Sequence, residues 1–79
     1  VGDGIDTVIT QVDWTLGANV ENLTLLGTAD QSGTGNDHDN VLTGNDGSNV
    51  LIGGAGNDTL DGSRGADTLE GGTGNDTLM

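Results

Sequence analysis

The clearest pattern in the chain is a leucine at every ninth position of its second half. These leucines are Leu42, Leu51, Leu60, Leu69 and Leu78. Most are flanked by β-branched or charged residues, in triplets such as "TLD" and "TLE". Neighbouring side chains of a strand point to opposite faces. Each triplet therefore predicts a short strand with its leucine inward and its flanking residues, such as Thr59, Asp61, Thr68 and Glu70, outward.

Glycine gives the pattern its frame. Five nine-residue lines begin with Gly, at residues 35, 44, 53, 62 and 71, and the fourth place is also Gly except at His38. Glycine reaches positive φ and allows close backbone approach, so places one to four predict a turn. The sixth place is polar in every line: Asn40, Asn49, Asp58, Asp67 and Asp76. A low-complexity linker is the alternative, but a linker has no reason to keep leucine in phase.

A single three-residue strand buries almost nothing, so the lines must stack to make a core. Stacked repeats of this kind form a solenoid in which each repeat contacts its neighbours. Residues 1–34 keep the frame less strictly. Val8 to Leu16 alternate apolar and polar residues, which predicts one longer half-buried strand, and "NVENLTLLGT" predicts a second. We expect one solenoid over 1–79, with longer or irregular coils over 1–34 and five in-phase repeats over 35–79.

The composition indicates that something besides the core must stabilise the fold. Only 30% of the residues are hydrophobic, Trp14 is the one aromatic residue, and 13 acids face the single cation Arg64 for a net charge of −12. Low hydrophobicity with high net charge is typical of disordered chains. The absence of Cys excludes disulfides and thiolate metal sites, which favours a hard cation bound by oxygen. The acidity would repel nucleic acid and anionic lipid, and no apolar stretch is long enough to span a membrane.

The last three lines, "GGAGNDTLD", "GSRGADTLE" and "GGTGNDTLM", resemble the G-G-x-G-x-D-x-U-x nonapeptide of RTX (repeats-in-toxin, haemolysin-type) proteins. The resemblance implies an all-β, right-handed parallel β-roll with two lines per coil and Ca²⁺ between stacked turns. It also implies a structural module of a secreted bacterial protein. Such a protein leaves the cell by type I secretion, folds on calcium outside, and carries adjoining domains in a longer chain. The activity of the parent protein does not follow.

The resemblance implies a ligand set for each pair of stacked turns, made of backbone carbonyls and sixth-place side chains. The first set joins the carbonyls of Gly54, Gly56, Gly71 and Thr73 to the side chains of Asp58 and Asp76. The second set joins the carbonyls of Asn45, Gly47, Gly62 and Arg64 to the side chains of Asn49 and Asp67. A third, less complete set joins the carbonyls of Asn36, His38, Gly53 and Ala55 to the side chains of Asn40 and Asp58. Asn brings no charge and bonds readily to neighbouring backbone, which makes lines 35–52 a candidate metal-free cap. Gly2, Gly4 and Asp6 form half of another turn.

Other functions are weaker on the same residues. An adhesive or ice-binding solenoid would use "GTGND", present at residues 33–37 and 72–76, but the lines between them lack Thr at that place. An enzyme is not indicated, because no Ser, His and Asp are arranged for nucleophilic catalysis. His38 has no second His for a zinc motif and is expected at a solvated turn. Trp14 is expected in the core or at an interface.

Overall fold

The computed structural model describes residues 7–17 and 20–79, and all the regular structure there is strand. The nine strands are β1 (Thr7–Thr10), β2 (Trp14–Thr15), β3 (Asn22–Leu25), β4 (Ser32–Thr34), β5 (Val41–Thr43), β6 (Val50–Ile52), β7 (Thr59–Asp61), β8 (Thr68–Glu70) and β9 (Thr77–Leu78). In the nine-residue lines, the strands β5 to β8 occupy places seven to nine, as predicted. In the part of the chain that the structure describes, no helix is long and apolar enough to cross a membrane.

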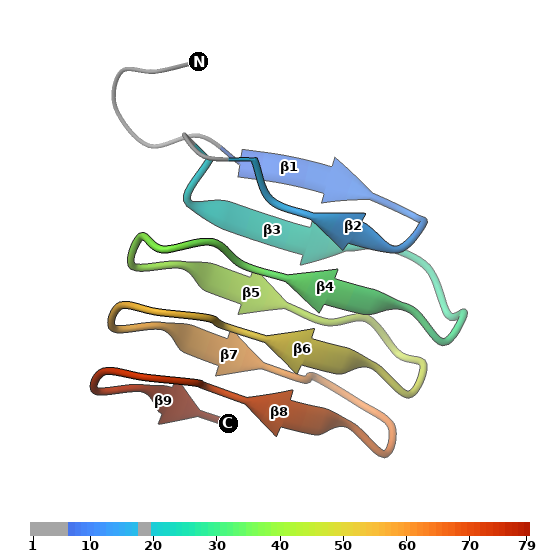
Figure 1. Cartoon of the computed structure of the whole chain (residues 1–79). Helices are drawn as coiled ribbons and strands as arrows, with labels where there is room; N and C mark the ends of the chain where they lie inside the picture. Colours follow the sequence, from blue (N-terminus) through green and yellow to red (C-terminus); the bar gives the residue numbers. More distant parts are fainter. Residues whose placement is uncertain (1–6, 18–19) are drawn as a thin grey trace.

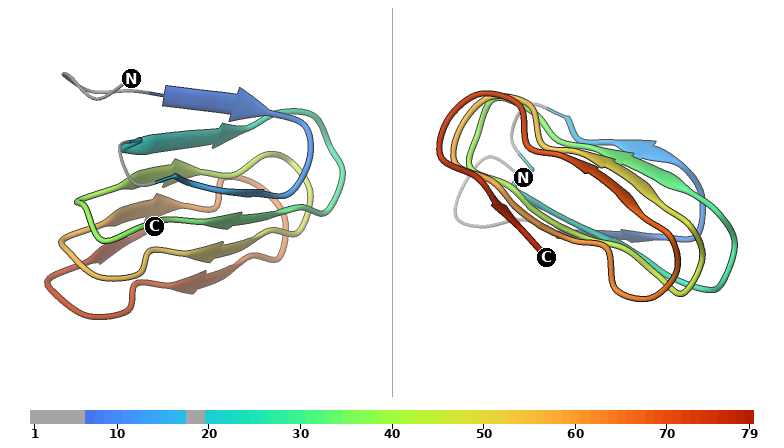
Figure 2. Two further views of the ribbon diagram at one scale, coloured as in Figure 1. Left: turned by 45° about the horizontal axis from the view of Figure 1, so that its top comes forward. Right: turned by 90° about the horizontal axis from the view of Figure 1, so that it is seen from below.

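The strands alternate between two parallel sheets and wind into a β-solenoid of about 4 turns (Figure 1). One sheet has the order β1-β3-β5-β7-β9 and the other β2-β4-β6-β8. Viewed along the stack, the coils lie over one another as flattened loops with the sheets as their long sides (Figure 2). The all-β parallel solenoid predicted from the sequence is therefore confirmed.

The pairing register confirms that two lines make one coil. Leu42 pairs with Leu60 and Leu60 with Leu78 in one sheet, while Leu51 pairs with Leu69 in the other. Line n therefore stacks on line n+2, and the leucines of each sheet form one column. Parallel pairing needs a long crossover, and here the intervening line on the opposite sheet supplies it.

The first coils have different lengths. Thr7 pairs with Asn22, 15 residues on, whereas Asn22 pairs with Val41, 19 residues on. The prediction of one strand from Val8 to Leu16 is wrong, because the chain bends at Gln11–Val12 between β1 and β2. These strands belong to different sheets, so a corner must separate them, and the Val12 N–H donates to Thr10 Oγ1 there at 3.3 Å.

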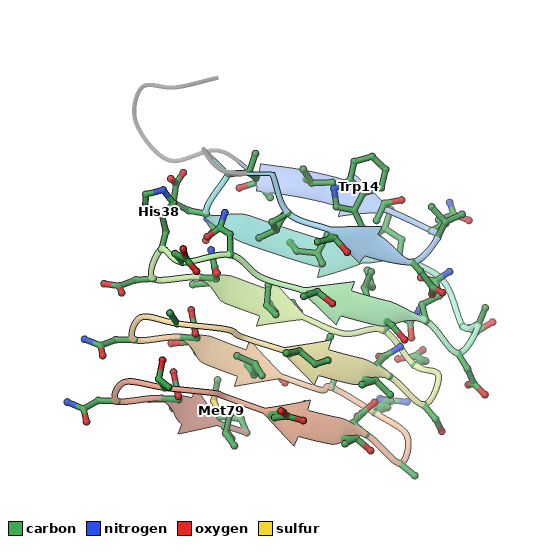
Figure 3. The ribbon with its side chains drawn as sticks, viewed as in Figure 1. Trp14, His38 and Met79 are labelled. Carbon is green, nitrogen blue, oxygen red and sulfur yellow. The ribbon has the colours of Figure 1, made fainter. Side chains whose placement is uncertain are left out.

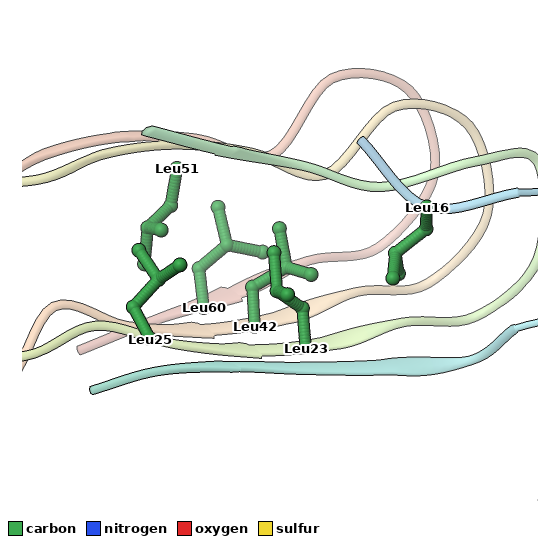
Figure 4. Packing of buried hydrophobic residues seen from close by; sticks show 6 residues of the cluster. All are labelled: Leu16, Leu23, Leu25, Leu42, Leu51 and Leu60. Atoms are coloured by element: carbon green, nitrogen blue, oxygen red, sulfur yellow. The ribbon is translucent and has the colours of Figure 1, made fainter. Parts of the chain in front are cut away.

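The core is a narrow file of leucines between the two sheets (Figure 4). It consists of Leu16, Leu23, Leu25, Leu42, Leu51 and Leu60. Leu69 is partly buried against this cluster. Leu78 on β9 is 48% exposed, and among the described strands β9 pairs only with β7. The inward phase of the eighth place is thus confirmed, with burial fading toward the last coil.

Trp14 lies outside this core. Its side chain is 42% exposed on the coil at the N-terminal end of the stack (Figure 3). The core alternative expected for Trp14 is therefore wrong, and the interface alternative stays a prediction. Trp14 pairs with Gly33 on the neighbouring coil. A Cβ on Gly33 would lie 2.6 Å from Leu23 Cδ2, so the inward position of β4 has no room for a side chain.

Candidate metal centre

The turns that join the two sheets form two stacks, one at each edge of the solenoid (Figure 1). We call the turns 35–40, 53–58 and 71–76 the first turn stack, and the turns 44–49 and 62–67 the second turn stack. The half-turn expected at Gly2, Gly4 and Asp6 lies outside the described residues. Each stack brings together residues 18 positions apart in the sequence.

The three C-terminal turns share an unusual backbone conformation at places two and four. In the first turn stack, Gly54 and Gly56 have φ of 87° and 92°, and Gly72 and Gly74 have φ of 81° and 94°. Glycine adopts this left-handed region without steric cost. The Gly54 and Gly56 carbonyls point at the α-carbons of Gly72 and Gly74 in the next coil, so closely that neither glycine has space for a Cβ. Two carbonyls of turn 53–58 therefore face turn 71–76.

Asp58 is the buried acid of this stack, with 1% of its surface exposed. Its Oδ1 accepts a hydrogen bond of 2.7 Å from the Asn40 N–H of the preceding coil. Its own N–H donates to Asp76 Oδ1 of the following coil at 2.8 Å. Asp58 Oδ2 is buried without a hydrogen-bond partner. Burial raises the pKa of this carboxyl, against the Asn40 hydrogen bond that lowers it, and the charges of Asp76 and Asp39 raise it further.

The orphaned oxygen shares a small space with a backbone carbonyl. The point where a Cβ of Gly53 would stand lies 2.6 Å from Asp58 Oδ2 and 2.9 Å from Gly71 O. A buried carboxylate oxygen without a donor is costly, and converging carboxylate and carbonyl oxygens suit a hard cation such as Ca²⁺. The residues present therefore fit such an ion. Asp58 and Gly71 O belong to the first ligand set predicted from the sequence, in which Asp76 and the carbonyls of Gly54, Gly56 and Thr73 stay predicted ligands.

The family model for the RTX calcium-binding nonapeptide repeat matches this chain in four copies, over residues 34–69 and 43–78. The chain belongs to the RTX calcium-binding repeat family. The comparisons with curated proteins and with solved structures find no match. RTX repeats are known to bind calcium and form a structural rather than a catalytic module.

In the RTX frame, the second ligand set also lies on adjacent turns. The point where a Cβ of Gly44 would stand lies 2.6 Å from Gly62 O, and the Asn49 N–H donates to Asp67 Oδ1 at 2.7 Å. The Asn49 side chain is already engaged, because its Oδ1 accepts from the Asn45 N–H at 2.8 Å and its Nδ2 donates to Gln31 O at 3.2 Å. Turn 62–67 carries Arg64 exposed beside Ser63, which has a φ of 66°. This gap has one carboxylate, and its Asn oxygen is occupied.

The third ligand set, on the first turn stack, also has one carboxylate and an Asn whose side chain is already hydrogen-bonded. Asn40 Oδ1 accepts from the Asn36 N–H at 2.8 Å, and Asn40 Nδ2 donates to Glu21 O at 3.0 Å. His38 is exposed at the turn, where Figure 3 shows it at the edge of the molecule. Among the described residues, no three or more His, Cys, Asp or Glu side chains form a group that could hold a metal by themselves. Backbone carbonyls are thus essential to any site built here.

Sequence reasoning missed the side chains of Asn36 and Asn45, of which it considered only the carbonyls. Each side chain bonds both to its own turn and to the preceding coil. A sequence pattern could have identified these two side chains. Both lines carry Asn at the second place together with Asn at the sixth place.

Proposed function

We propose that this chain is a calcium-binding structural module of a secreted bacterial protein, which folds when it meets calcium outside the cell. The observation that carries the proposal is Asp58 Oδ2, buried and unpartnered beside Gly71 O. The RTX repeat and the solenoid support a calcium-binding structural module. Export by type I secretion, an extracellular or cell-surface location and adjoining domains in a longer chain are further parts of the proposal.

The electrostatics give calcium its effect on folding. Stacking the coils brings Asp58 and Asp76 together in a chain whose net charge is −12. A divalent cation between the turns would offset this repulsion and give the buried carboxylate a partner. Binding free energy of a metal that requires the folded site acts as folding free energy. The coils that carry Asp58 and Asp76 are therefore expected to be unfolded at the low calcium level of the cytosol and folded outside.

Circular dichroism of the purified chain tests the proposal. We expect the β signal to increase and the coil signal to decrease from chelator to millimolar calcium, with magnesium a poor substitute because it demands a tight octahedral shell. The same folded spectrum in chelator and in calcium would contradict it.

The alternative of an adhesive or ice-binding surface needs its Thr residues in one row. Thr34 lies in strand β4 and Thr73 lies in the turn 71–76. The two "GTGND" segments thus do not present Thr at equivalent positions, and the calcium-binding module is preferred.

A further inference from the structure

The side-chain amides of Asn36 and Asn40 bridge the gap between turn 35–40 and the coil before it, and Asn36 makes most of the bonds. Asn36 Nδ2 donates to Gly17 O at 2.6 Å and to Val20 O at 2.7 Å, both on the preceding coil. Asn36 Oδ1 accepts from the His38 N–H at 2.9 Å and from Asn40 Nδ2 at 3.0 Å. The amide thus joins two carbonyls of one turn to the backbone of the next.

The opposite edge of the solenoid repeats this arrangement. Asn45 Nδ2 donates to Leu26 O and Ala29 O, each at 3.1 Å. Asn45 Oδ1 accepts from the Gly47 N–H at 2.8 Å and from Asn49 Nδ2 at 2.9 Å. Asn45 and Asn49 are both buried. Two separate edges therefore use the same pair of residues, Asn at place two and Asn at place six.

These bonds lie between stacked turns of adjacent coils, as the calcium ligands proposed for the later coils do. A side-chain amide has two N–H donors and one acceptor oxygen, so a single Asn satisfies converging carbonyls on one side and a backbone N–H on the other. It needs no carboxylate and adds no charge. In the three C-terminal turns, the second place is Gly54, Ser63 or Gly72, which lack an amide. There the sixth place is Asp, whose charge requires a counter-ion when it is buried.

We propose that the amides of Asn36 and Asn45 take the place of calcium between the first coils. The coils up to residue 52 then form a platform that folds without metal. This inference rests on the proposed function in one respect, namely that the later coils need calcium to fold whereas the platform does not. The buried residues of the platform support it, because Leu23, Leu25, Leu42 and Leu51 lie in these coils and make up most of the core.

The platform gives calcium-driven folding a starting surface. The Thr59 N–H donates to Asn40 O at 2.8 Å, and the Thr68 N–H donates to Asn49 O at 2.8 Å. The first coil beyond residue 52 thus finds the strand edges of a folded coil already present. Because folding of a repeat array propagates from a folded repeat to its neighbour, each later coil only adds to an existing edge.

Hydrogen exchange of the whole chain by NMR, in chelator and then in calcium, tests the platform. The Val50 N–H donates to Gln31 O within the platform, and the Thr77 N–H donates to Asp58 O beyond it. We expect Val50 to be protected in chelator, and Thr77 to gain protection only on calcium. Loss of Val50 protection in chelator, with recovery on calcium, would overturn the platform and leave the proposed function intact. If instead the protection of the Thr77 amide were the same in chelator and in calcium, the proposed function would be contradicted. Protection of Val50 in chelator would still support the platform.

The variant Asn45→Asp isolates the amide. It keeps an oxygen for the Gly47 N–H but replaces the Nδ2 donors by an oxygen facing two carbonyls. We expect Val50 protection in chelator to fall by at least about tenfold, since two buried hydrogen bonds are lost. Asn57→Asp is the matched control. It makes the same charge change at an exposed turn residue whose Oδ1 accepts from the Asn75 N–H.

Equal effects of these two variants would overturn the proposal, because charge alone would then explain the loss. If Asn45→Asp is too unstable to measure, Asn36→Asp makes the same test on the opposite edge. There the amide is only half-buried, and the Val41 N–H, which donates to Glu21 O, is the reporter. An Asn36→Asp chain with unchanged Val41 protection in chelator would count against the inference.

Discussion

The Asp58 N–H donates to Oδ1 of Asp76, 2.8 Å away on the next coil. Two acids that are far apart in the sequence are thereby joined through the backbone of one and the carboxylate of the other. The bond orients Asp76 but leaves Asp58 Oδ2 unpartnered. This relationship makes Asp58 the acid on which the proposed calcium site depends most.

We predict that Asp58→Ala weakens calcium binding more than Asp67→Ala or Asp76→Ala in this chain. Asp58 is the buried member of the only described turn pair that has two sixth-place carboxylates. Its loss should reduce the apparent calcium affinity by at least about tenfold relative to Asp67→Ala, or about 1.4 kcal/mol. Isothermal titration calorimetry of the three variants checks the ranking. Equal losses would show that the two turn stacks do not differ in the way that the geometry indicates.

The raised pKa of Asp58 predicts an unusual pH response in chelator. A carboxyl whose pKa is higher in the folded than in the unfolded chain stabilises the fold below its ordinary pKa, and this contribution is lost as the pH rises through the raised value. Acidification from neutral pH toward the ordinary value of 3.8 should therefore stabilise the metal-free coils around Asp58. Far-UV circular dichroism against pH in chelator would record the gain.

Asp58→Asn is the control for the pH prediction, because it removes the titrating group at nearly constant volume. The stabilisation on acidification should shrink in this variant. With calcium present the sign should reverse, since protons compete with the ion for the carboxylate. A metal-free chain that loses structure steadily on acidification, equally in both forms, would contradict the assignment to Asp58.

Leu60 tests the stacked core. It is fully buried between Leu42 and Leu78 in one column, so Leu60→Ala should cost roughly 2–5 kcal/mol. Because metal binding and folding are linked, the cost should appear as a higher calcium concentration at the folding midpoint. Thr59→Ala changes the neighbouring, outward residue and should shift the midpoint far less. Similar shifts for both would mean that the eighth place is not the inward one.

Ser63 and Gly72 occupy the same second place in successive lines and allow a reciprocal exchange. Ser63 has a φ of 66°, a left-handed conformation that costs a side-chain-bearing residue about 1 kcal/mol. Ser63→Gly should relieve this strain, whereas Gly72→Ser should introduce it and place a Cβ against Gly54 O. Calcium-dependent thermal unfolding should therefore move up in the first variant and down in the second. A shift of the same sign in both would contradict this conformational reading.

The repeating half of the fold was predictable because its information is local. Within one nine-residue line, Gly indicates the turn, and a leucine such as Leu60 in the middle of its triplet indicates the strand and its inward face. The stacking of each line on the second line after it followed from the RTX resemblance. The corner at Val12 was not predictable in this way. Alternation from Val8 to Leu16 fits one long strand as well as two short ones, and only the closure of the coil decides between them.

The candidate site, too, was predictable only in part from the sequence. The sequence identified Asp58 and Asp76 as a pair, because both stand at place six of lines that stack. It did not show that Asn45 bonds across the gap to Leu26 and Ala29. Those two residues lie outside the regular frame, and their carbonyls reach Asn45 only after the irregular coil has closed.

The pairing of every line with the second line after it has a consequence for how such a chain can change. The turns of the first, third and fifth lines lie at one edge of the solenoid, and those of the second and fourth lines lie at the other. Successive lines along the sequence therefore contribute their turns to opposite edges. If calcium binds as proposed, a substitution at Asp58 changes the number of ions at one edge and leaves the turns around Asp67 unchanged. The number of ions held along each side of the solenoid can thus diverge, one repeat at a time, while the leucine column between them stays the same.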